Sequence, residues 1–384
     1  MNRCIRCKGK GDCGLVTCPV MARFYAQVKR RPVQNIMAPA PSPFIGSHGY
    51  PHVSAGPLLI DDSDCPPEWI RQGYSIDDIV SIRAETIRGI SSGNQFLDKI
   101  QEVALSSVPI DVEVAFEKPV SYDFSFDGTI APVGMSGSLT RMSVIENAKV
   151  PRPIDKVTSD TDVPAIDAVR ELIREGIDVY QIIPLLSTGL LGQGKQRKVV
   201  PTRWAITAVD DMAGKKGKKD LINKSWISSI QVLFATGFKN TICCILIPGP
   251  WEFEMIEIWD RQSLWAGDTI SICVDGEKEK KSGYSPISGA YYSARLAVLE
   301  YLTGLGRTAT VLVIRYVSNE YWAPLGTWVI REITRKAVAG SCYECSDIPD
   351  AVKIASQMLG FSWWYSHSRM LPRIQSQQTL SSFF

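Results

Sequence analysis

The chain has 384 residues, of which 45% are hydrophobic and 21% are charged, a composition typical of a globular protein with room for two domains or one large α/β body. The formal net charge of +2 at pH 7 excludes a strongly basic protein, so any surface that binds nucleic acid must be a local patch. The chain has no run of about 18 apolar residues and no apolar segment after its first methionine, which argues against a membrane-spanning helix or a secretory signal. Ten cysteines would suit an oxidising compartment, but four of them are grouped within the first 18 residues, as metal ligands would be, which predicts a cytoplasmic location.

Four cysteines lie within the first 18 residues, at Cys4, Cys7, Cys13 and Cys18. Their spacing, C-x2-C-x5-C-x4-C, and the glycines between them suit a short chain that turns back to bring four thiolates to one tetrahedral metal ion. Two disulfides or a redox C-x-x-C motif are the alternatives, but neither a secretory signal nor a βαβ surrounding supports them. We therefore predict a closed structural zinc site in residues 1–28, with no open ligand position for catalysis.

Residues 29–66 are rich in proline, a composition that predicts extended chain packed over a surface and not helix. Within this segment, residues 44–57 hold three glycines, two prolines and two of the three histidines of the chain, His48 and His52. A loop of this kind could position either histidine for acid–base chemistry or for contact with phosphate. A rigid turn with two exposed histidines explains the same pattern equally well, so both interpretations stay open.

The next segments predict helices and strands in alternation. Apolar residues recur at helical spacing over 79–90 and again over 96–103, which predicts two helices separated at 91–93. Residues 110–116 alternate between apolar and polar side chains, as in a strand with one solvated face. A further helix is expected after the charged, proline-containing stretch at 145–163.

Residues 192–224 form the most highly charged stretch of the chain. Its candidate nucleic-acid contacts are Lys195, Arg197, Lys198, Arg203, Trp204, Lys215, Lys216, Lys218 and Lys219. Arg203 beside Trp204 offers a charge and a stacking face, the pairing that sites for single-stranded nucleic acid use. The intervening glycines predict a flexible patch that contacts phosphate, although single lysines are more often solvated surface residues.

Asp210 and Asp211 lie between the two basic groups, directly after an apolar run at 205–209. Adjacent acids at such a place can hold a divalent metal ion beside phosphates, which would make them catalytic. More often such acids simply follow the end of a strand, and we favour that interpretation. Together with His48 and His52, they complete the set of candidate catalytic residues.

The following part of the chain, 226–317, is rich in β-forming residues and predicts a sheet, interrupted by a helix over 289–304. Glu252 and Glu254 alternate with apolar neighbours, so we expect them on the solvent side of an edge strand, with an acidic site as the alternative. The pair Cys342-x2-Cys345 could hold a second metal ion if further cysteines joined it.

The pattern as a whole predicts an α/β (α+β) fold, in which a mixed, sheet-rich body carries flanking helices. We divide the chain into a zinc module at 1–28, an N-terminal part of the body at 29–155, a C-terminal α/β part at 156–366 and a flexible tail at 367–384. The boundary after residue 155 is a prediction from composition, and a loop within one continuous body explains it equally well.

The last eight residues, 377–384, have the pattern Q-x-x-L-x-x-F-F. Residues three apart share one side of a tight helical turn, so Leu380, Phe383 and Phe384 can form a single apolar plug. So short a peptide cannot hold a helix alone and should become ordered only on a partner. A frayed apolar terminus is the alternative, but it leaves two phenylalanines in water without a reason.

Gln377, Leu380, Phe383 and Phe384 match every anchor of the PCNA-interacting peptide, or PIP box, the motif that docks on the DNA sliding clamp. The resemblance implies that Gln377 occupies a small polar pocket of the clamp while the three apolar side chains fill a hydrophobic one. It therefore implies that the sliding clamp PCNA is a partner of this chain.

The chain as a whole resembles the archaeal Nre family, DNA-repair factors associated with the sliding clamp. The resemblance rests on the four N-terminal cysteines, on the PIP box, and on residues 44–57, 201–211 and 321–332. It implies a role in DNA damage repair with binding to the clamp. For such a protein with a local basic patch, we expect contact with DNA and a cytoplasmic, nucleoid-associated location. It supplies no catalytic mechanism.

Three hypotheses follow from these patterns. In the first, the chain is a repair factor that its tail recruits to the clamp and that contacts DNA through its basic patch. In the second, it is a clamp-tethered enzyme (a nuclease, a glycosylase or a nucleotide hydrolase) that acts on damaged DNA through the candidate catalytic residues. In the third, it is a non-enzymatic scaffold that bridges the clamp to another repair factor. The residues leave the choice between enzyme and non-enzyme open.

Overall fold

The computed structural model describes residues 32–61, 64–92, 95–122, 134–264, 266–278 and 283–376. Among the helices described, none is both long enough and apolar enough to cross a membrane. The chain divides into two compact units: the N-terminal unit extends to Ala213 and includes 323–326, and the C-terminal unit holds 214–322 and the residues from Thr327. The division falls within one helix, α9 (Thr202–Asp220). The domain boundary expected after residue 155 stays a prediction.

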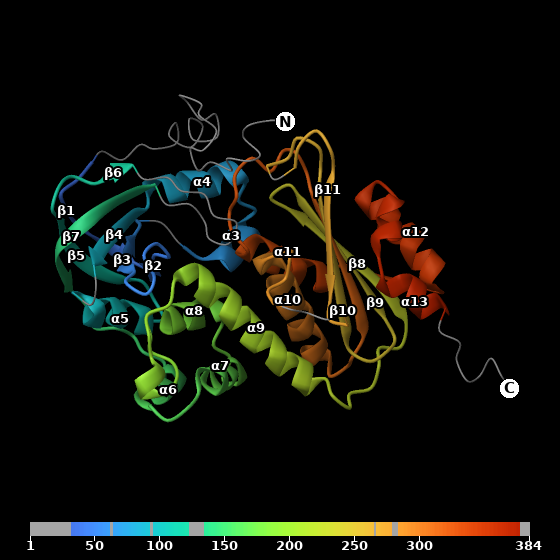
Figure 1. Ribbon diagram of the computed structural model, residues 1–384, viewed down its shortest axis with the longest axis horizontal. Coiled ribbons are helices and arrows are strands. Elements are labelled where there is room, and N and C mark those ends of the chain that lie inside the picture. Colours follow the sequence, from blue (N-terminus) through green and yellow to red (C-terminus); the bar gives the residue numbers. More distant parts are fainter. Residues whose placement is uncertain are drawn as a thin grey trace. The chain divides into compact units, whose positions relative to one another are not determined.

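The N-terminal unit is built around a mixed sheet with the strand order β1–β5–β7–β4–β3–β2, in which β6 also pairs with β7 (Figure 1). The strands are β1 (Asn35–Ala40), β2 (Ser42–Ile45), β3 (Ser54–Leu59), β4 (Ile87–Ser92), β5 (Ile110–Phe116), β6 (Ser121–Tyr122) and β7 (Met135–Val144). β4 and β7 run parallel, and the other neighbours run antiparallel. The alternation predicted for residues 110–116 is confirmed, because the apolar side chains of β5 are buried except for the partly exposed Ala115, while Asp111 and Glu113 are partly exposed.

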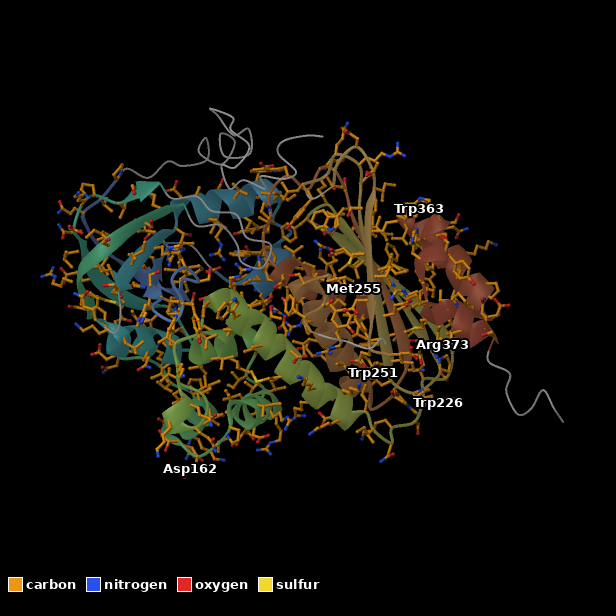
Figure 2. The ribbon with its side chains drawn as sticks, in the orientation of Figure 1. Asp162, Trp226, Trp251, Met255, Trp363 and Arg373 are labelled. Carbon is orange, nitrogen blue, oxygen red and sulfur yellow. The ribbon has the colours of Figure 1, made fainter. Side chains whose placement is uncertain are left out.

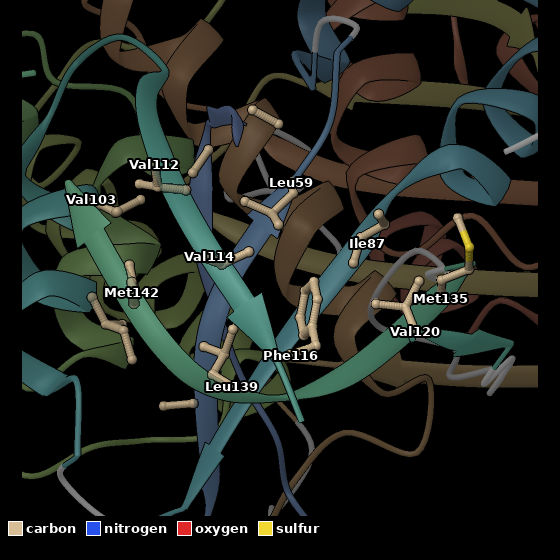
Figure 3. Packing of buried hydrophobic residues seen from close by; sticks show 14 of the residues in the cluster. Leu59, Ile87, Val103, Val112, Val114, Phe116, Val120, Met135, Leu139 and Met142 are labelled. Carbon is tan, nitrogen blue, oxygen red and sulfur yellow. The ribbon is translucent and has the colours of Figure 1, made fainter. Parts of the chain in front are cut away.

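Helices accompany this sheet, and one of them, Leu97–Leu105, contributes side chains to its apolar core. They are α3 (Pro66–Gln72), α4 (Ile76–Glu85), α5 (Leu97–Leu105), α6 (Arg152–Ser159), α7 (Ala165–Arg174), α8 (Val179–Ser187), the 3-10 turn η1 (Gly194–Gln196) and the first part of α9. α5 confirms the helix predicted over 96–103, and its Val103 joins one apolar cluster with Leu59, Val112 and Met142 of the sheet (Figure 3). This cluster stabilises the sheet to which β2 and β3, the strands on either side of the histidine-containing turn, belong.

The helix predicted over residues 79–90 is shorter than expected. α4 begins at a capping box, in which the Asp78 N–H donates to the Ser75 hydroxyl oxygen and the Ser75 N–H donates to the Asp78 carboxylate. The helix ends at Glu85 because Thr86 is extended, and residues 87–92 form strand β4. The β-branched residues of this segment suit a strand, and pairing with β3 and β7 decides the outcome.

The C-terminal unit is built around a second mixed sheet, with the strand order β11–β10–β12–β9–β8–β13. Its strands are β8 (Ile230–Gly237), β9 (Asn240–Ile247), β10 (Glu252–Trp259), β11 (Ser271–Gly276), β12 (Thr310–Val317) and β13 (Cys342–Cys345). Its helices are α10 (Gly289–Leu305), α11 (Trp328–Val338), α12 (Ile348–Leu359), the 3-10 turn η2 (Trp363–His367) and α13 (Met370–Ser376). Figure 1 shows α10 and α11 on one face of the sheet and α12 and α13 on the other. The predicted α/β class, with a sheet-rich body and flanking helices, is confirmed.

β10 is an interior strand of the second sheet, between β11 and β12, so the prediction that Glu252 and Glu254 face solvent on an edge strand is wrong. The two carboxylates do share one face of the strand, as their alternation with apolar residues predicts. That face is the one that α12 and α13 cover, and it leaves Glu252 6% and Glu254 3% exposed.

α9 is one continuous helix, so the prediction of a strand end at Asp210 and of flexible glycines at 214 and 217 is wrong. Ala205, Val209 and Ala213 recur every four residues and are buried, which is helical spacing. A Cβ on Gly214 would lie 3.0 Å from Arg295 Nη2, and one on Gly217 would lie 3.0 Å from Leu299 Cβ of α10. These glycines therefore let α9 pack closely on α10 and do not supply flexibility.

Candidate nucleic-acid interface

The two candidate histidines lie on the turn that joins β2 to β3. The turn begins where the Gly46 N–H donates to the Ser54 carbonyl oxygen (2.8 Å), and within it the His52 N–H donates to the Gly49 carbonyl oxygen (2.9 Å). Gly49 has a φ of 76°, a conformation that favours glycine. His48 and His52 are both exposed. Backbone hydrogen bonds thus hold the turn while both imidazoles face solvent.

A side-chain contact fixes the base of the turn to the sheet. Arg88 of β4 donates from Nη2 to the Ser54 hydroxyl oxygen (2.8 Å), and its guanidinium lies 4.2 Å from the centre of the Phe44 ring. A Cβ on Gly46 would lie 2.6 Å from that hydroxyl oxygen and 2.8 Å from Arg88 Nη2, so a side chain there would displace the contact between Ser54 and Arg88. Sequence reasoning missed Arg88, because no local pattern links it to the turn.

The turn is joined to the N-terminus of α9. The Ile45 N–H donates to Thr202 Oγ1 (2.8 Å), which also lies 3.3 Å from the Ser187 hydroxyl oxygen. The rings of Tyr50 and Trp204 meet edge to face, with centroids 4.8 Å apart and planes at 60°. Tyr50 is 46% exposed and Trp204 is 44% exposed. The fold thus brings together two features that the sequence predicted separately, and we call the result the turn–helix surface: residues 47–52 with Arg203 and Trp204.

The basic candidates that precede α9 or begin it have different environments. Lys195, Lys198 and Arg203 are exposed. Arg197 is engaged with the protein, because its guanidinium donates to three backbone carbonyl oxygens at 2.6 to 2.8 Å. These acceptors are Gly192, Thr158 and Asp160. A contact between Arg197 and phosphate, which stays a prediction, would have to compete with these bonds.

The basic candidates near the end of α9 belong to the C-terminal unit. Lys216 is paired with an aspartate one turn later, and Lys218 Nζ lies 2.9 Å from Glu277 Oε2. Lys215 and Lys219 are exposed. The predicted basic patch is therefore divided between the two units, with its aromatic residue in the N-terminal one.

The candidate metal ligands among the described residues do not form a cluster that could hold a metal ion. Asp210 is fully buried on α9, and Asp211 is half-buried beside it. Cys342 and Cys345 lie three residues apart on β13, where the first is exposed and the second is buried on the other face. Within the described residues, no group of three or more His, Cys, Asp and Glu side chains is arranged to hold a metal ion.

α13, the last helix that the structure describes, is held by two carboxylates of β10. Glu254 accepts hydrogen bonds from the Ser368 hydroxyl (2.6 Å) and from the N–H groups of the next two residues (2.9 and 3.1 Å). Glu252 pairs with Arg373 of α13, which Figure 2 labels. Sequence reasoning missed this anchorage; a serine two residues before an apolar run was the local signal of a helix start.

The two strongest motifs lie outside the described residues. They are the predicted zinc ligands Cys4, Cys7, Cys13 and Cys18, and the predicted PIP-box anchors Gln377, Leu380, Phe383 and Phe384. The described chain ends at Ser376, directly before the PIP box.

Comparison with known proteins places the chain in a family. A family model described as "Archaeal Nre, N-terminal" matches residues 13–266, and one described as "Archaeal Nre, C-terminal" matches residues 276–383. No solved structure matches the chain.

Named relatives match over most of their length. DNA repair protein NreA of Archaeoglobus fulgidus is 34% identical over 395 residues, which cover 100% of this chain and 98% of that protein. DNA repair protein NreA of Haloferax volcanii is 37% identical over 346 residues, which cover 84% of this chain and 82% of that protein. DNA repair protein NreB of A. fulgidus is 33% identical and covers 99% of both chains. From the family models and the relatives together, the chain belongs to the archaeal Nre family.

Proposed function

We propose that this protein is a DNA repair factor that contacts DNA with its folded body and is recruited to the sliding clamp by residues 377–384. The repair role is supported by the relatives, because the proteins that match the chain along most of their length are named DNA repair proteins. Recruitment to the clamp is supported by the match of Gln377, Leu380, Phe383 and Phe384 to the PIP box.

The PIP-box match carries the recruitment, and the anchorage of α13 fixes the helix directly before that motif. Glu254 holds the N-terminus of this helix, and Glu252 pairs with Arg373 at its middle. Met370 and Leu371 add apolar contacts to the core beneath it. Because the anchored chain reaches Ser376, the PIP-box residues follow the folded body directly. A clamp bound to them would stay close to the body at a high effective concentration.

Contact with DNA is supported by three exposed cations, Arg203 on the turn–helix surface and Lys195 and Lys198 in the segment that precedes α9. Phosphate contacts supply most of the affinity of proteins for DNA, and each needs an accessible cation. The net charge of only +2 indicates modest affinity for the body alone. The clamp would compensate by holding the body near DNA.

A structural zinc ion at residues 1–28 is part of the proposal. Four thiolates, from Cys4, Cys7, Cys13 and Cys18, fill a tetrahedral coordination sphere and leave no open position for substrate. Elemental analysis of the purified protein should find one zinc ion per chain, and zinc should be lost when Cys4 and Cys7 are replaced by serine. Protein that is folded and free of zinc would exclude this part of the proposal.

Calorimetric titration of the purified clamp with the intact protein tests the recruitment. Replacing Leu380, Phe383 and Phe384 by alanine should weaken binding roughly 100-fold or more, because buried apolar and aromatic anchors account for most of the binding energy at such interfaces. The matched control replaces Thr379, Ser381 and Ser382 by alanine, which changes the same number of side chains between the anchors, and it should bind like the natural protein. Undiminished binding by the anchor variant would disprove recruitment by this motif.

A further inference from the structure

We infer that the turn–helix surface binds an unpaired base of single-stranded DNA, which stacks on the rings of Tyr50 and Trp204. The inference rests on the proposed contact with DNA and specifies the form of DNA that this surface takes. Two independent observations carry it. One is the exposure of a firmly held aromatic pair, and the other is the absence of acidic residues from both segments that form the surface.

The aromatic pair leaves ring surface available for a ligand. Aromatic side chains that pack on each other usually bury most of their area, yet Tyr50 and Trp204 are 46% and 44% exposed. Their edge-to-face contact, with centroids 4.8 Å apart, covers only part of the two rings. A flat base can therefore lie against the remaining ring area while the contact between Tyr50 and Trp204 persists.

Hydrogen bonds hold the backbone segments that carry the two rings. Tyr50 lies in a turn that two backbone hydrogen bonds close. Trp204 lies in the first turn of α9, and the bond from the Ile45 N–H to Thr202 Oγ1 joins that helix to the strand before the turn. A site that is already rigid loses little conformational freedom when a ligand binds, so more of the stacking energy appears as affinity.

The charges of the two segments that form the surface favour a polyanion. Residues 41–60 and residues 179–209, which supply the turn and the start of α9, contain no Asp or Glu. The second segment contains four Lys or Arg residues, of which Lys198 and Arg203 precede Trp204 in the chain and are exposed. A phosphate backbone that follows this surface meets cations and no repelling carboxylate from either segment.

The stacking geometry favours a single strand over a duplex. Bases inside a duplex are stacked on each other, so their faces are not accessible to a side-chain ring without unstacking. Bases in a gap, a flap or a damaged stretch already offer a free face. Such a contact reads no base edges, so we expect little dependence on sequence.

Fluorescence anisotropy of the full-length protein with labelled oligo(dT), and with the same strand in a duplex, tests the inference. Tyr50→Ala and Trp204→Ala should each weaken single-strand binding roughly 5- to 100-fold, and Trp204→Phe should retain most of it because the ring face persists. Binding to the duplex should change far less. The matched control is Trp226→Ala, which removes a tryptophan that is 57% exposed in the C-terminal unit (Figure 2) and should leave both affinities unchanged.

Photocrosslinking of the unaltered protein to a strand that carries 5-iodouracil gives a second readout that does not depend on how the variants fold. Crosslinks to Tyr50 or Trp204 support the inference, and crosslinks confined to other residues overturn it. Three further results would also overturn it: unchanged single-strand affinity in both folded alanine variants, equal losses for strand and duplex, or no single-strand binding by the intact protein. The clamp titration is independent, so its failure would reject recruitment while leaving the stacking site in place.

Discussion

Glu254 is the residue on which the start of α13 depends. Its carboxylate accepts a hydrogen bond from the Ser368 hydroxyl and from two backbone N–H groups at the helix N-terminus. A negative charge at this end of a helix is also stabilised by the helix dipole. Because Glu254 is only 3% exposed, its removal would leave buried donors without their acceptor.

Replacing Glu254 by alanine should therefore lower the free energy of unfolding by about 1–3 kcal/mol, the usual effect of unsatisfied buried donors. Hydrogen exchange should become faster at the amides of α13, while the amides of α10 on the opposite face of the sheet keep their protection. Glu344→Ala, at an exposed position on β13, should change neither quantity by more than a few tenths of a kcal/mol. Unchanged protection of α13 in Glu254→Ala would show that apolar contacts alone hold the helix.

The alternation of apolar and polar residues predicted on which face of β10 Glu254 lies, but not that this face is buried. Its alternation with apolar residues along β10 correctly placed it on the same face as Glu252. The face is covered by α12 and α13, and Ser368, which donates to Glu254, lies 114 residues later in the chain. Alternation cannot show whether a helix or water will cover a face, so the expected solvent exposure was wrong.

At the scale of elements, β3 and β4 approach each other at a pair of glycines. A Cβ on Gly56 would lie 2.0 Å from the Gly89 carbonyl oxygen, and a Cβ on Gly89 would lie 2.9 Å from Pro57 Cδ. The first of these distances is far too short for any Cβ atom. The atom that the Cβ would meet belongs to the backbone, so it cannot rotate away as the end of a side chain can. Since β3 follows directly from the turn, this approach also positions the turn–helix surface.

Replacing Gly56 by alanine should destabilise the protein by about 2 kcal/mol or more, because backbone atoms of β4 must move. Urea denaturation monitored by circular dichroism measures this change. Gly304→Ala is the matched control: a Cβ there meets nothing within 4 Å, and alanine favours a helix over glycine, so this variant should be unchanged or up to about 1 kcal/mol more stable. Equal stability of the two variants would contradict the close approach of β3 and β4.

The elements that the sequence predicted well are those with one dominant pattern. Alternation alone predicted the strand β5, and helical spacing alone predicted the helix α5. The run at 205–209 was ambiguous, because five mostly apolar residues fit a strand or a helix, and only the extension of the spacing to Ala213 distinguishes them. The glycines of α9 were misread as flexible because the helix that packs on them, α10, cannot be inferred from their own neighbours.

At the scale of the whole molecule, the net charge does not show how the charged residues are distributed along the chain. The net charge of +2 coexists with a stretch of 31 residues, 179–209, that has four basic and no acidic side chains. Sequence reasoning identified Arg203, Trp204, His48 and His52 one by one. It could not join them, since the contact between Tyr50 and Trp204 links positions more than 150 residues apart. Only the tertiary fold brings the turn and the start of α9 together.

The central claim is that residues 377–384 bring a DNA-contacting body to the clamp. The most direct measurement compares the intact protein with a chain that ends at Ser376, both binding to a clamp loaded on DNA with an unpaired stretch. We predict that the intact protein binds roughly 100-fold or more tightly, because two linked contacts act together, and that the shortened chain keeps only the weak affinity of its body for DNA. Equal affinity of the two chains, with circular dichroism showing that both are folded, would contradict the claim.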